Sequence, residues 1–106
     1  MLNDQKKKLG LMVSVSPDTP GFAQALTQAE KALANGDKVY LYCIDDAVEG
    51  LSDSRLIKLK SDGLNLFGCA YSVRQRKLPL NDSAIFTGLS VLSDIMADTD
   101  RFESFN

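Results

Sequence analysis

Residues 39–44 read VYLYCI, and this stretch decides the fold class. It is almost entirely apolar and rich in β-branched and aromatic residues, so side chains on both faces of a strand here are suited to burial. A strand buried on both faces is typical of a parallel sheet that is covered by helices on each side. Because parallel strands are joined by long crossover connections, the segments around residues 39–44 should contain helices.

The flanking segments carry helix signals. Upstream, Thr19 is a suitable N-cap, Pro20 suits the first helical position, and Gly36 suits the end of the helix. Between them, apolar side chains recur at helical spacing, at Phe22, Leu26, Ala29 and Leu33. Downstream, Ser52 can cap a second helix that Gly63 would end.

The alternation of strands and helices continues in both directions. Short apolar runs predict four more strands, at residues 8–15, 64–68, 84–87 and 101–105, and helices are predicted at residues 69–77 and 89–96. This order predicts an α/β protein, a three-layer sandwich with a mostly parallel sheet of about five strands and helices on both faces, flavodoxin-like in character. A chain of 106 residues fits one such domain, spanning 1–106.

Composition excludes several classes of function. Twelve basic residues against fourteen acidic ones argue against a nucleic-acid partner, and no apolar run approaches the ~20 residues of a membrane span. The chain has no histidine, which removes Ser-His-Asp and Cys-His catalysis. Its two cysteines are too few for a disulfide framework, so we expect a reducing, cytoplasmic location.

Cys69 is the principal candidate for chemistry. It follows a short apolar strand and Gly68, and it opens the predicted helix at residues 69–77. The junction lies at the carboxyl edge of the predicted sheet, where open α/β sheets place their functional crevice. If the helix N-terminus points at the sulfur, free N–H groups from the turn at Gly68–Ala70 would favour an exposed thiolate. The alternative is a small cysteine that is simply packed in the core.

Three further residues relate to Cys69. Arg74 and Arg76 follow on the same helix and are candidates for electrostatic help or for docking a partner. Cys43 ends a strand that is predicted to be buried, which favours an inert thiol. If the two strands are neighbours, however, Cys43 could resolve an oxidised Cys69 as a disulfide.

A second candidate site is the loop at residues 14–19, which reads SVSPDT. Ser16 and the other hydroxyls are reminiscent of a phosphate-binding loop, which keeps an FMN- or nucleotide-binding module among the hypotheses. Pro17 has no N–H to offer a phosphate, and Asp18 would add a like charge. The acidic loop at residues 45–49 is interpreted as solvated, and no metal site is predicted.

The segment at residues 63–69, GLNLFGC, with Arg76 seven residues after Cys69, resembles the DsrE/DsrF-like family, which includes TusD-type sulfur-relay subunits and YchN-like proteins. The resemblance extends over nearly the whole chain. It implies a DsrE-like α/β sandwich that forms homo- or hetero-oligomers, often trimers or hexamers. It also implies that Cys69 takes up sulfur as a persulfide and passes it on. Many relatives have glycine at the position of Lys77, and some have a second cysteine at the position of Ser72, so a two-cysteine mechanism on one helix is disfavoured here.

The leading hypothesis is therefore a small cytoplasmic sulfur carrier with Cys69 as its working thiol, acting as a homo-oligomer between a donor and an acceptor protein. It needs no metal or organic cofactor. The alternatives are a non-catalytic assembly or binding subunit of the same fold, and an FMN or nucleotide binder that uses Ser16.

Overall fold

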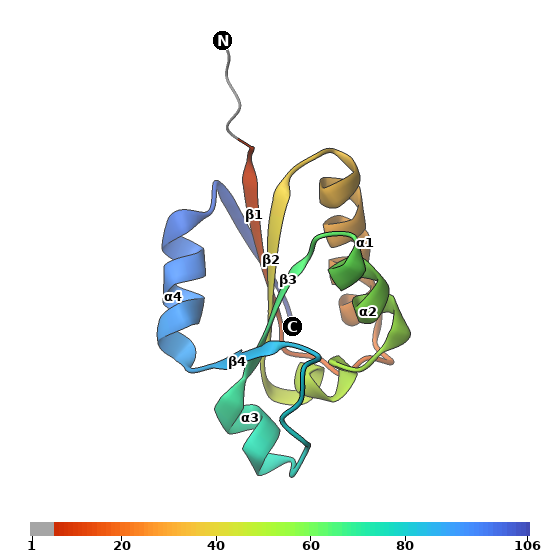
Figure 1. The fold of residues 1–106 in the computed structure, drawn as a ribbon, viewed down its shortest axis with the longest axis vertical. Coiled ribbons are helices and arrows are strands. Elements are labelled where there is room, and N and C mark those ends of the chain that lie inside the picture. The colour runs from red at the N-terminus through yellow and green to blue at the C-terminus, as the bar shows by residue number, and fades with distance from the viewer. Residues whose placement is uncertain (1–5) are drawn as a thin grey trace.

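Five parallel strands form one sheet in the order β4-β3-β2-β1-β5. The computed structural model describes residues 6–106. The strands are β1 (Lys8–Val13), β2 (Lys38–Cys43), β3 (Asn65–Cys69), β4 (Ile85–Thr87) and β5 (Arg101–Phe105). From β1 to β4, each strand lies beside the strand that precedes it in the sequence. The chain then returns to the other side of β1, where β5 pairs with it, as Figure 1 shows.

Helices cover both faces of the sheet, which confirms the predicted three-layer α/β architecture (Figure 1). Helices α1 (Pro20–Ala34) and α2 (Ser54–Ser61) lie on one face, and α4 (Leu89–Asp98) lies on the other. The short helix α3 (Ala70–Gln75) lies at the end of the sheet where β3 finishes. Within residues 6–106, no helix is long and apolar enough to cross a membrane.

Local chemistry explains where the helices begin. The Thr19 hydroxyl accepts a hydrogen bond from the backbone N–H of Phe22, at 3.3 Å, so the predicted cap of α1 is confirmed. The predicted cap of α2 at Ser52 is wrong, because Asp53 takes that role. The Asp53 carboxylate accepts from both the backbone N–H and the guanidinium of Arg55, at 2.9 and 3.0 Å, which a serine hydroxyl cannot match.

The acidic loop expected at residues 45–49 is instead a 3₁₀ helix, η1 (Asp45–Gly50). Asp45 begins it with a φ of 53°, a left-handed conformation that aspartate tolerates better than most residues. The buried Ser72 hydroxyl of α3 accepts a hydrogen bond from the Asp45 N–H at 3.0 Å. The turn after β2 is therefore held by the helix that follows β3.

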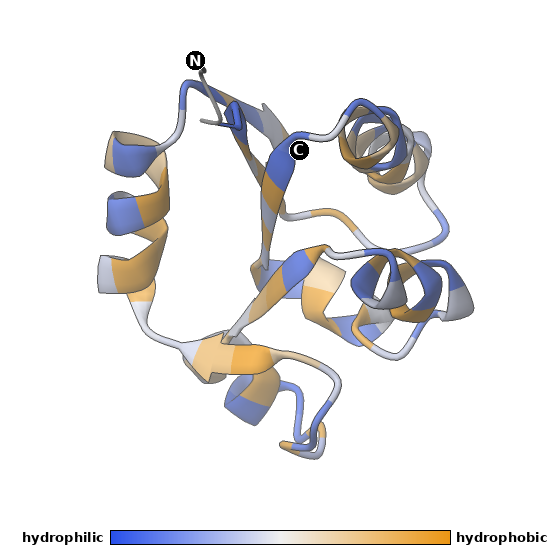
Figure 2. Cartoon of the chain, turned by 45° about the horizontal axis from the view of Figure 1, so that its top comes forward, coloured by the Kyte–Doolittle hydropathy of each residue, from blue (hydrophilic) through white to orange (hydrophobic). Residues whose placement is uncertain are grey.

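The alternation of side chains divides the core into two parts. On the face covered by α1 and α2, the buried side chains of β1 and β2 are Leu9, Leu11, Val13, Val39, Leu41 and Cys43. On the face covered by α4, Tyr42 and Cys69 pack with Ile95, and Tyr40 and Phe67 are only partly buried against them. The single helix α4 covers less of its face than α1 and α2 cover of theirs, as Figure 2 shows.

Candidate functional site

Cys69 is the last residue of β3 and the N-cap of α3. Because the strands are parallel, this position lies at the carboxyl edge of the sheet, as predicted. Its register partner on β4 is Thr87, so the cysteine stands directly beside the β4–α4 junction. The thiol is free, and the residue is 3% exposed. The structure therefore places a free thiol just beneath the surface at the expected edge.

Tyr42 approaches Cys69 from the neighbouring strand. Its side chain is fully buried and stacks with Phe67 at a ring-centroid distance of 6.5 Å. Its hydroxyl can donate to the backbone carbonyl of Gly88 at 3.0 Å or of Thr87 at 3.2 Å, and the Thr87 hydroxyl lies 3.4 Å away as a donor to it. Burial raises the pKa of Tyr42, and the neighbouring Cys69 thiol contributes to that rise.

The sequence indicated Tyr42 only as core. The signal that would have found it is the register of β2 on β3, in which Tyr42 lies opposite Phe67. Side chains alternate along β3, so Phe67 and Cys69 share one face, and Tyr42 shares it with them. A hydroxyl at the end of a long, rigid side chain is thereby brought to the end of β3.

The structure places Cys69 at the N-terminus of a helix, as the sequence predicted. Helix α3 has only six residues, and the Cys69 side chain makes no capping hydrogen bond to it. The sulfur instead packs on the α4 side of the sheet. Gly68 also has a packing role, because a Cβ there would meet the Leu51 side chain at 2.8 Å and the Phe86 ring at 3.3 Å. The half-buried Ala70 is the first residue of α3.

Cys43 lies on the opposite face of the sheet from Cys69. It is fully buried in the core beneath α1 and α2, and its register partner on β3 is Gly68. Burial raises the pKa of the Cys43 thiol to about 12. Because the sheet separates the two sulfur atoms, this arrangement does not bring Cys43 to Cys69 as a resolving thiol.

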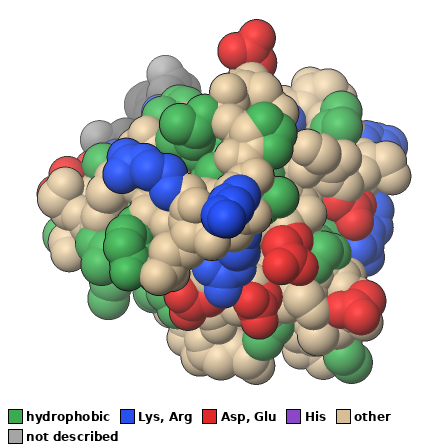
Figure 3. Space-filling view, turned by 90° about the horizontal axis from the view of Figure 1, so that it is seen from below, with side chains coloured by type: hydrophobic (Ala, Val, Ile, Leu, Met, Phe, Trp, Pro, Cys, Tyr) green, Lys and Arg blue, Asp and Glu red, His purple; other side chains and the backbone are tan. Residues whose placement is uncertain are grey.

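The two arginines of the Cys69 helix have different surroundings. The Arg76 guanidinium pairs with Asp46 at 2.8 Å and with Glu49 at 4.0 Å, and it also donates to the Ser72 carbonyl at 3.3 Å. These contacts tie α3 to η1, and the Asp46 carboxylate raises the pKa of Arg76. Arg74 is exposed. Basic and acidic side chains lie side by side on the end of the molecule drawn in Figure 3.

The loop at residues 14–19 lies two strands away from β3, and its polar groups bond to one another. The Ser16 hydroxyl donates to the Asp18 carboxylate at 2.5 Å, and the Ser16 carbonyl accepts from the N–H and hydroxyl of Thr19. The Ser14 hydroxyl donates to the Asn106 side chain at 2.8 Å. Ser16 is thus not brought together with Cys69, and the Asp18 carboxylate would repel a phosphate at this loop.

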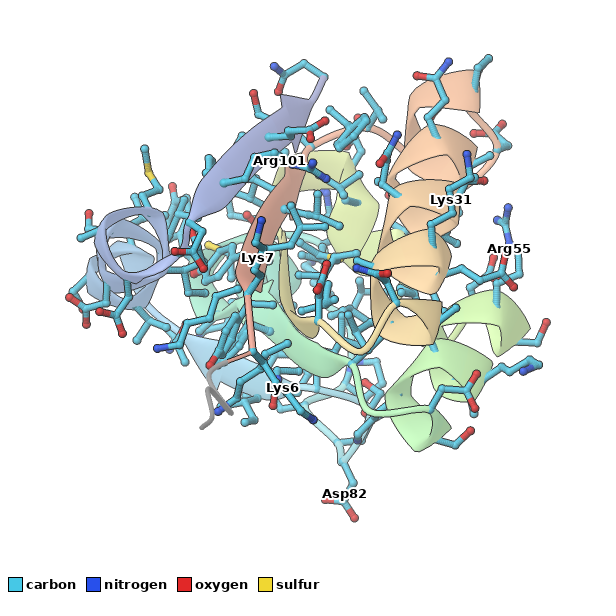
Figure 4. All side chains as sticks on the ribbon, turned by 90° about the horizontal axis from the view of Figure 1, so that it is seen from above. Lys6, Lys7, Lys31, Arg55, Asp82 and Arg101 are labelled. Atoms are coloured by element: carbon cyan, nitrogen blue, oxygen red, sulfur yellow. The ribbon has the colours of Figure 1, made fainter. Side chains whose placement is uncertain are left out.

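The described residues contain no group of three or more histidine, cysteine or acidic side chains placed to hold a metal ion. At the other end of the sheet, Lys6 and Lys7 precede β1, and their side chains point in different directions (Figure 4). These two lysines lie at the amino ends of the strands, whereas Cys69 lies at the carboxyl ends.

Comparison with solved structures identifies the class of fold. The chain superimposes on YchN from E. coli with a TM-score of 0.82 at 16% identity, over 95% of this chain and 100% of that one. It also matches BT1422 from Bacteroides thetaiotaomicron, described as a conserved protein of unknown function, with a TM-score of 0.78 at 11% identity over 92% and 94% of the two chains. No family model and no curated protein sequence matches the chain.

The fold is therefore like that of YchN, a three-layer α/β sandwich with a five-stranded parallel sheet. The fold that the family resemblance implied is confirmed. Lys77 stands where the sequence resemblance implies glycine. It has a φ of 55°, a conformation in which glycine costs least.

Proposed function

We propose that this protein is a sulfur carrier that holds sulfur as a persulfide on Cys69. The observation that carries the proposal is a free thiol at the carboxyl end of β3, an inner strand of a YchN-like fold, beside the β4–α4 junction. Ligands of open α/β sheets bind outside the carboxyl ends of the strands. A cysteine there needs no metal and no histidine to exchange sulfur, because the thiolate is itself the nucleophile.

The transfer consists of two exchange steps. The Cys69 thiolate attacks the outer sulfur of a donor persulfide, R–S–SH; the Cys69–sulfur bond forms, the S–S bond of the donor breaks, and R–S⁻ leaves. The product is Cys69–S–SH. The thiolate of an acceptor then attacks the outer sulfur of that persulfide, takes it as R′–S–SH and releases the Cys69 thiolate. No external oxidant or reductant enters either step.

Access to the thiol requires a local opening. Cys69 is 3% exposed, and the segment beside it is the junction of Thr87 and Gly88, which Tyr42 holds by its hydroxyl. Gly88 itself is exposed, and a Cβ there would meet nothing within 4 Å. Movement of this junction away from β3 would uncover the sulfur while leaving the core beneath α1 and α2 intact. We place this activity in the cytoplasm, between a donor and an acceptor protein.

Intact-protein mass spectrometry after incubation with glutathione persulfide tests the proposal. We expect one added sulfur atom in the wild type and in Cys43→Ala, and none in Cys69→Ser. Subsequent addition of a small thiol should remove the sulfur, because the second exchange step returns Cys69 to its thiol form. Failure of the wild type to gain sulfur, with Cys69 resisting iodoacetamide until the protein is unfolded, would refute the carrier function.

A second candidate, a non-catalytic assembly subunit, is favoured by a separate observation. Large apolar side chains are exposed on β4 and α4, with exposed fractions of 59% at Ile85, 55% at Leu89 and 53% at Met96. On the same face of the sheet, a groove of about 110 Å³ runs between α4 and the rings of Tyr40 and Phe67. We propose that this surface supports a homo-oligomer, a trimer or a hexamer.

Light scattering on the wild type and on Leu89→Lys tests the assembly. We expect an oligomer in the wild type and a monomer in the variant, because a buried lysine at an interface loses its hydration without a partner. A wild type that remains monomeric at high protein concentration would contradict the proposed assembly.

A further inference from the structure

The Tyr42 side chain passes over β3, the strand that carries Cys69. Tyr42 extends from β2, and its hydroxyl reaches the Thr87 carbonyl on β4, at 3.2 Å. Strand β3 lies between β2 and β4 in the sheet. A side chain that starts on β2 and bonds to β4 must therefore pass over β3.

The residue of β3 that it passes is Cys69. Cys69 is the register partner of Thr87 and belongs to the same buried cluster as Tyr42, on the α4 side of the sheet. Phe67, the residue of β3 that precedes it on that face, lies beside the Tyr42 ring, with which it stacks. The phenol oxygen therefore lies above the end of β3, next to the sulfur.

We propose that Tyr42 is a positioning residue for the Cys69 sulfur, its hydroxyl donating a hydrogen bond to the thiolate and to the persulfide anion that forms from it. This inference rests on the proposed carrier function. In the resting state the single hydroxyl proton is shared between the carbonyls of Thr87 and Gly88. A sulfur that becomes negatively charged is a stronger acceptor than a carbonyl, so the proton turns toward it.

Tyr42 keeps its proton throughout the exchange. Burial raises the pKa of Tyr42, so the phenol stays neutral, and remains a donor, over the pH range in which a thiol ionises. When the junction at Gly88 moves away, the hydroxyl loses its carbonyl acceptors, and the sulfur becomes its remaining partner. Opening of the site and stabilisation of the nucleophile are thereby linked through one side chain.

The charged side chains on the elements around Cys69 are engaged or directed elsewhere. On α3 and η1, Arg76 pairs with Asp46 and Glu49. Asp94 and Asp98 of α4 line the groove beside Tyr40. The exposed Arg74 and Asp45 make no ion pair within 4 Å among residues 6–106, and each is open to solvent, which screens its charge. Tyr42 thus remains the buried polar group beside the sulfur.

The test compares Tyr42→Phe with Tyr40→Phe. Tyr40 is a matched control because it lies two residues earlier on the same face of β2, stacks on the same Phe67, and likewise loses only a hydroxyl. The ionisation midpoint of Cys69 is read from its ¹³Cβ chemical shift in a pH titration, which requires no reagent to enter the site. We expect the acid dissociation constant of Cys69 to fall about tenfold or more in Tyr42→Phe and to stay unchanged in Tyr40→Phe.

A purely structural role of Tyr42 gives a different result. Loss of the hydroxyl would then only loosen the junction at Gly88, which raises the rate of Cys69 alkylation equally at every pH and leaves the ionisation midpoint where it was. That outcome would overturn the inference. Tyr42→3-fluorotyrosine provides a second test with a side chain of nearly the same shape. Its more acidic hydroxyl is a stronger hydrogen-bond donor, so the ionisation midpoint of Cys69 should move to lower pH.

The two proposals fail separately. If glutathione persulfide transfers no sulfur to Cys69 but the midpoint moves in Tyr42→Phe, the carrier function is wrong and the tyrosine still acts on the thiolate. If sulfur is transferred and the midpoint does not move, Tyr42 has no such role and the carrier function stands.

Discussion

Gly68→Ala should destabilise the protein without altering the chemistry of the neighbouring Cys69. A Cβ at Gly68 would approach the Leu51 Cδ1 atom to 2.8 Å and two atoms of the Phe86 ring to 3.3 Å. Leu51 is 4% exposed and belongs to the core, so it cannot swing into solvent to make room. Overpacking of this kind costs about 1–3 kcal/mol of unfolding free energy.

Gly88→Ala is the matched control for this substitution. It adds the same methyl group, but a Cβ at Gly88 meets nothing within 4 Å, and its φ of −87° is one that alanine adopts freely. We therefore expect its unfolding free energy to equal the wild-type value or to exceed it by a few tenths of a kcal/mol. The contrast between the two glycines isolates the steric term from the general effect of replacing glycine.

Urea denaturation followed by circular dichroism measures both variants. Because Gly68 faces α1 and α2 and Cys69 faces α4, the rate of Cys69 alkylation per folded molecule should be the same in Gly68→Ala as in the wild type. An unfolding free energy for Gly68→Ala within about 0.5 kcal/mol of the wild type would show that the sheet and η1 separate easily, and the packing argument would fail.

Two further predictions concern titratable groups. The pKa of Cys43 is about 12 in the folded protein against 9.0 in the unfolded chain, so its contribution to the free energy of unfolding is fully present below about pH 9. Above that pH the unfolded thiol ionises, and the free energy of unfolding falls by about 1.4 kcal/mol per pH unit. Denaturation at pH 8 and pH 10 should show this loss in the wild type and not in Cys43→Ala. The pKa of Asp53 is lowered by its hydrogen bonds with Arg55, so its contribution is present at neutral pH and disappears on acidification through that lowered pKa; Asp53→Ala should cost about 1 kcal/mol at pH 7, where it removes the cap of α2, and a cost that persists undiminished at pH 2 would contradict this account.

The sequence was sufficient for the fold because its signals are redundant. Residues 39–44 are apolar on both faces, which requires cover on both sides of the sheet, and each neighbouring strand is separated from the next by a segment with a helix start and a helix end. The two errors are local ones. Ser52 and Asp53 are adjacent residues that can both cap a helix, and only the position of Arg55 favours the second. The 3₁₀ helix η1 depends on a contact with Ser72 that comes from a distant part of the chain.

The sequence predicted the edge of the sheet at which Cys69 lies, but not the face of the sheet on which its sulfur lies. That Cys69 ends a strand follows from the composition of residues 64–69, and its place at the carboxyl edge follows from the parallel sheet. Which face its sulfur occupies depends on the parity of the strand, and a shift of one residue would have turned it toward Cys43. The role inferred for Tyr42 depends on the register of three strands together, which no local pattern encodes.

The position of the second thiol determines what kind of relay is possible. A second thiol at position 72 would lie one helical turn from Cys69. This chain has a serine there, and its hydroxyl accepts a hydrogen bond from the Asp45 N–H. Cys43, the one other cysteine of the chain, is on the far side of the sheet. If Cys69 carries a persulfide as proposed, no second thiol of this arrangement can receive its sulfur, and the acceptor we propose is another molecule. On this proposal, the junction at Gly88 must open wide enough for the thiol of an acceptor protein to reach the sulfur. A disulfide that tethers this junction to α3 should therefore slow the release of sulfur to an acceptor protein. It should slow the loading of Cys69 by a small persulfide much less.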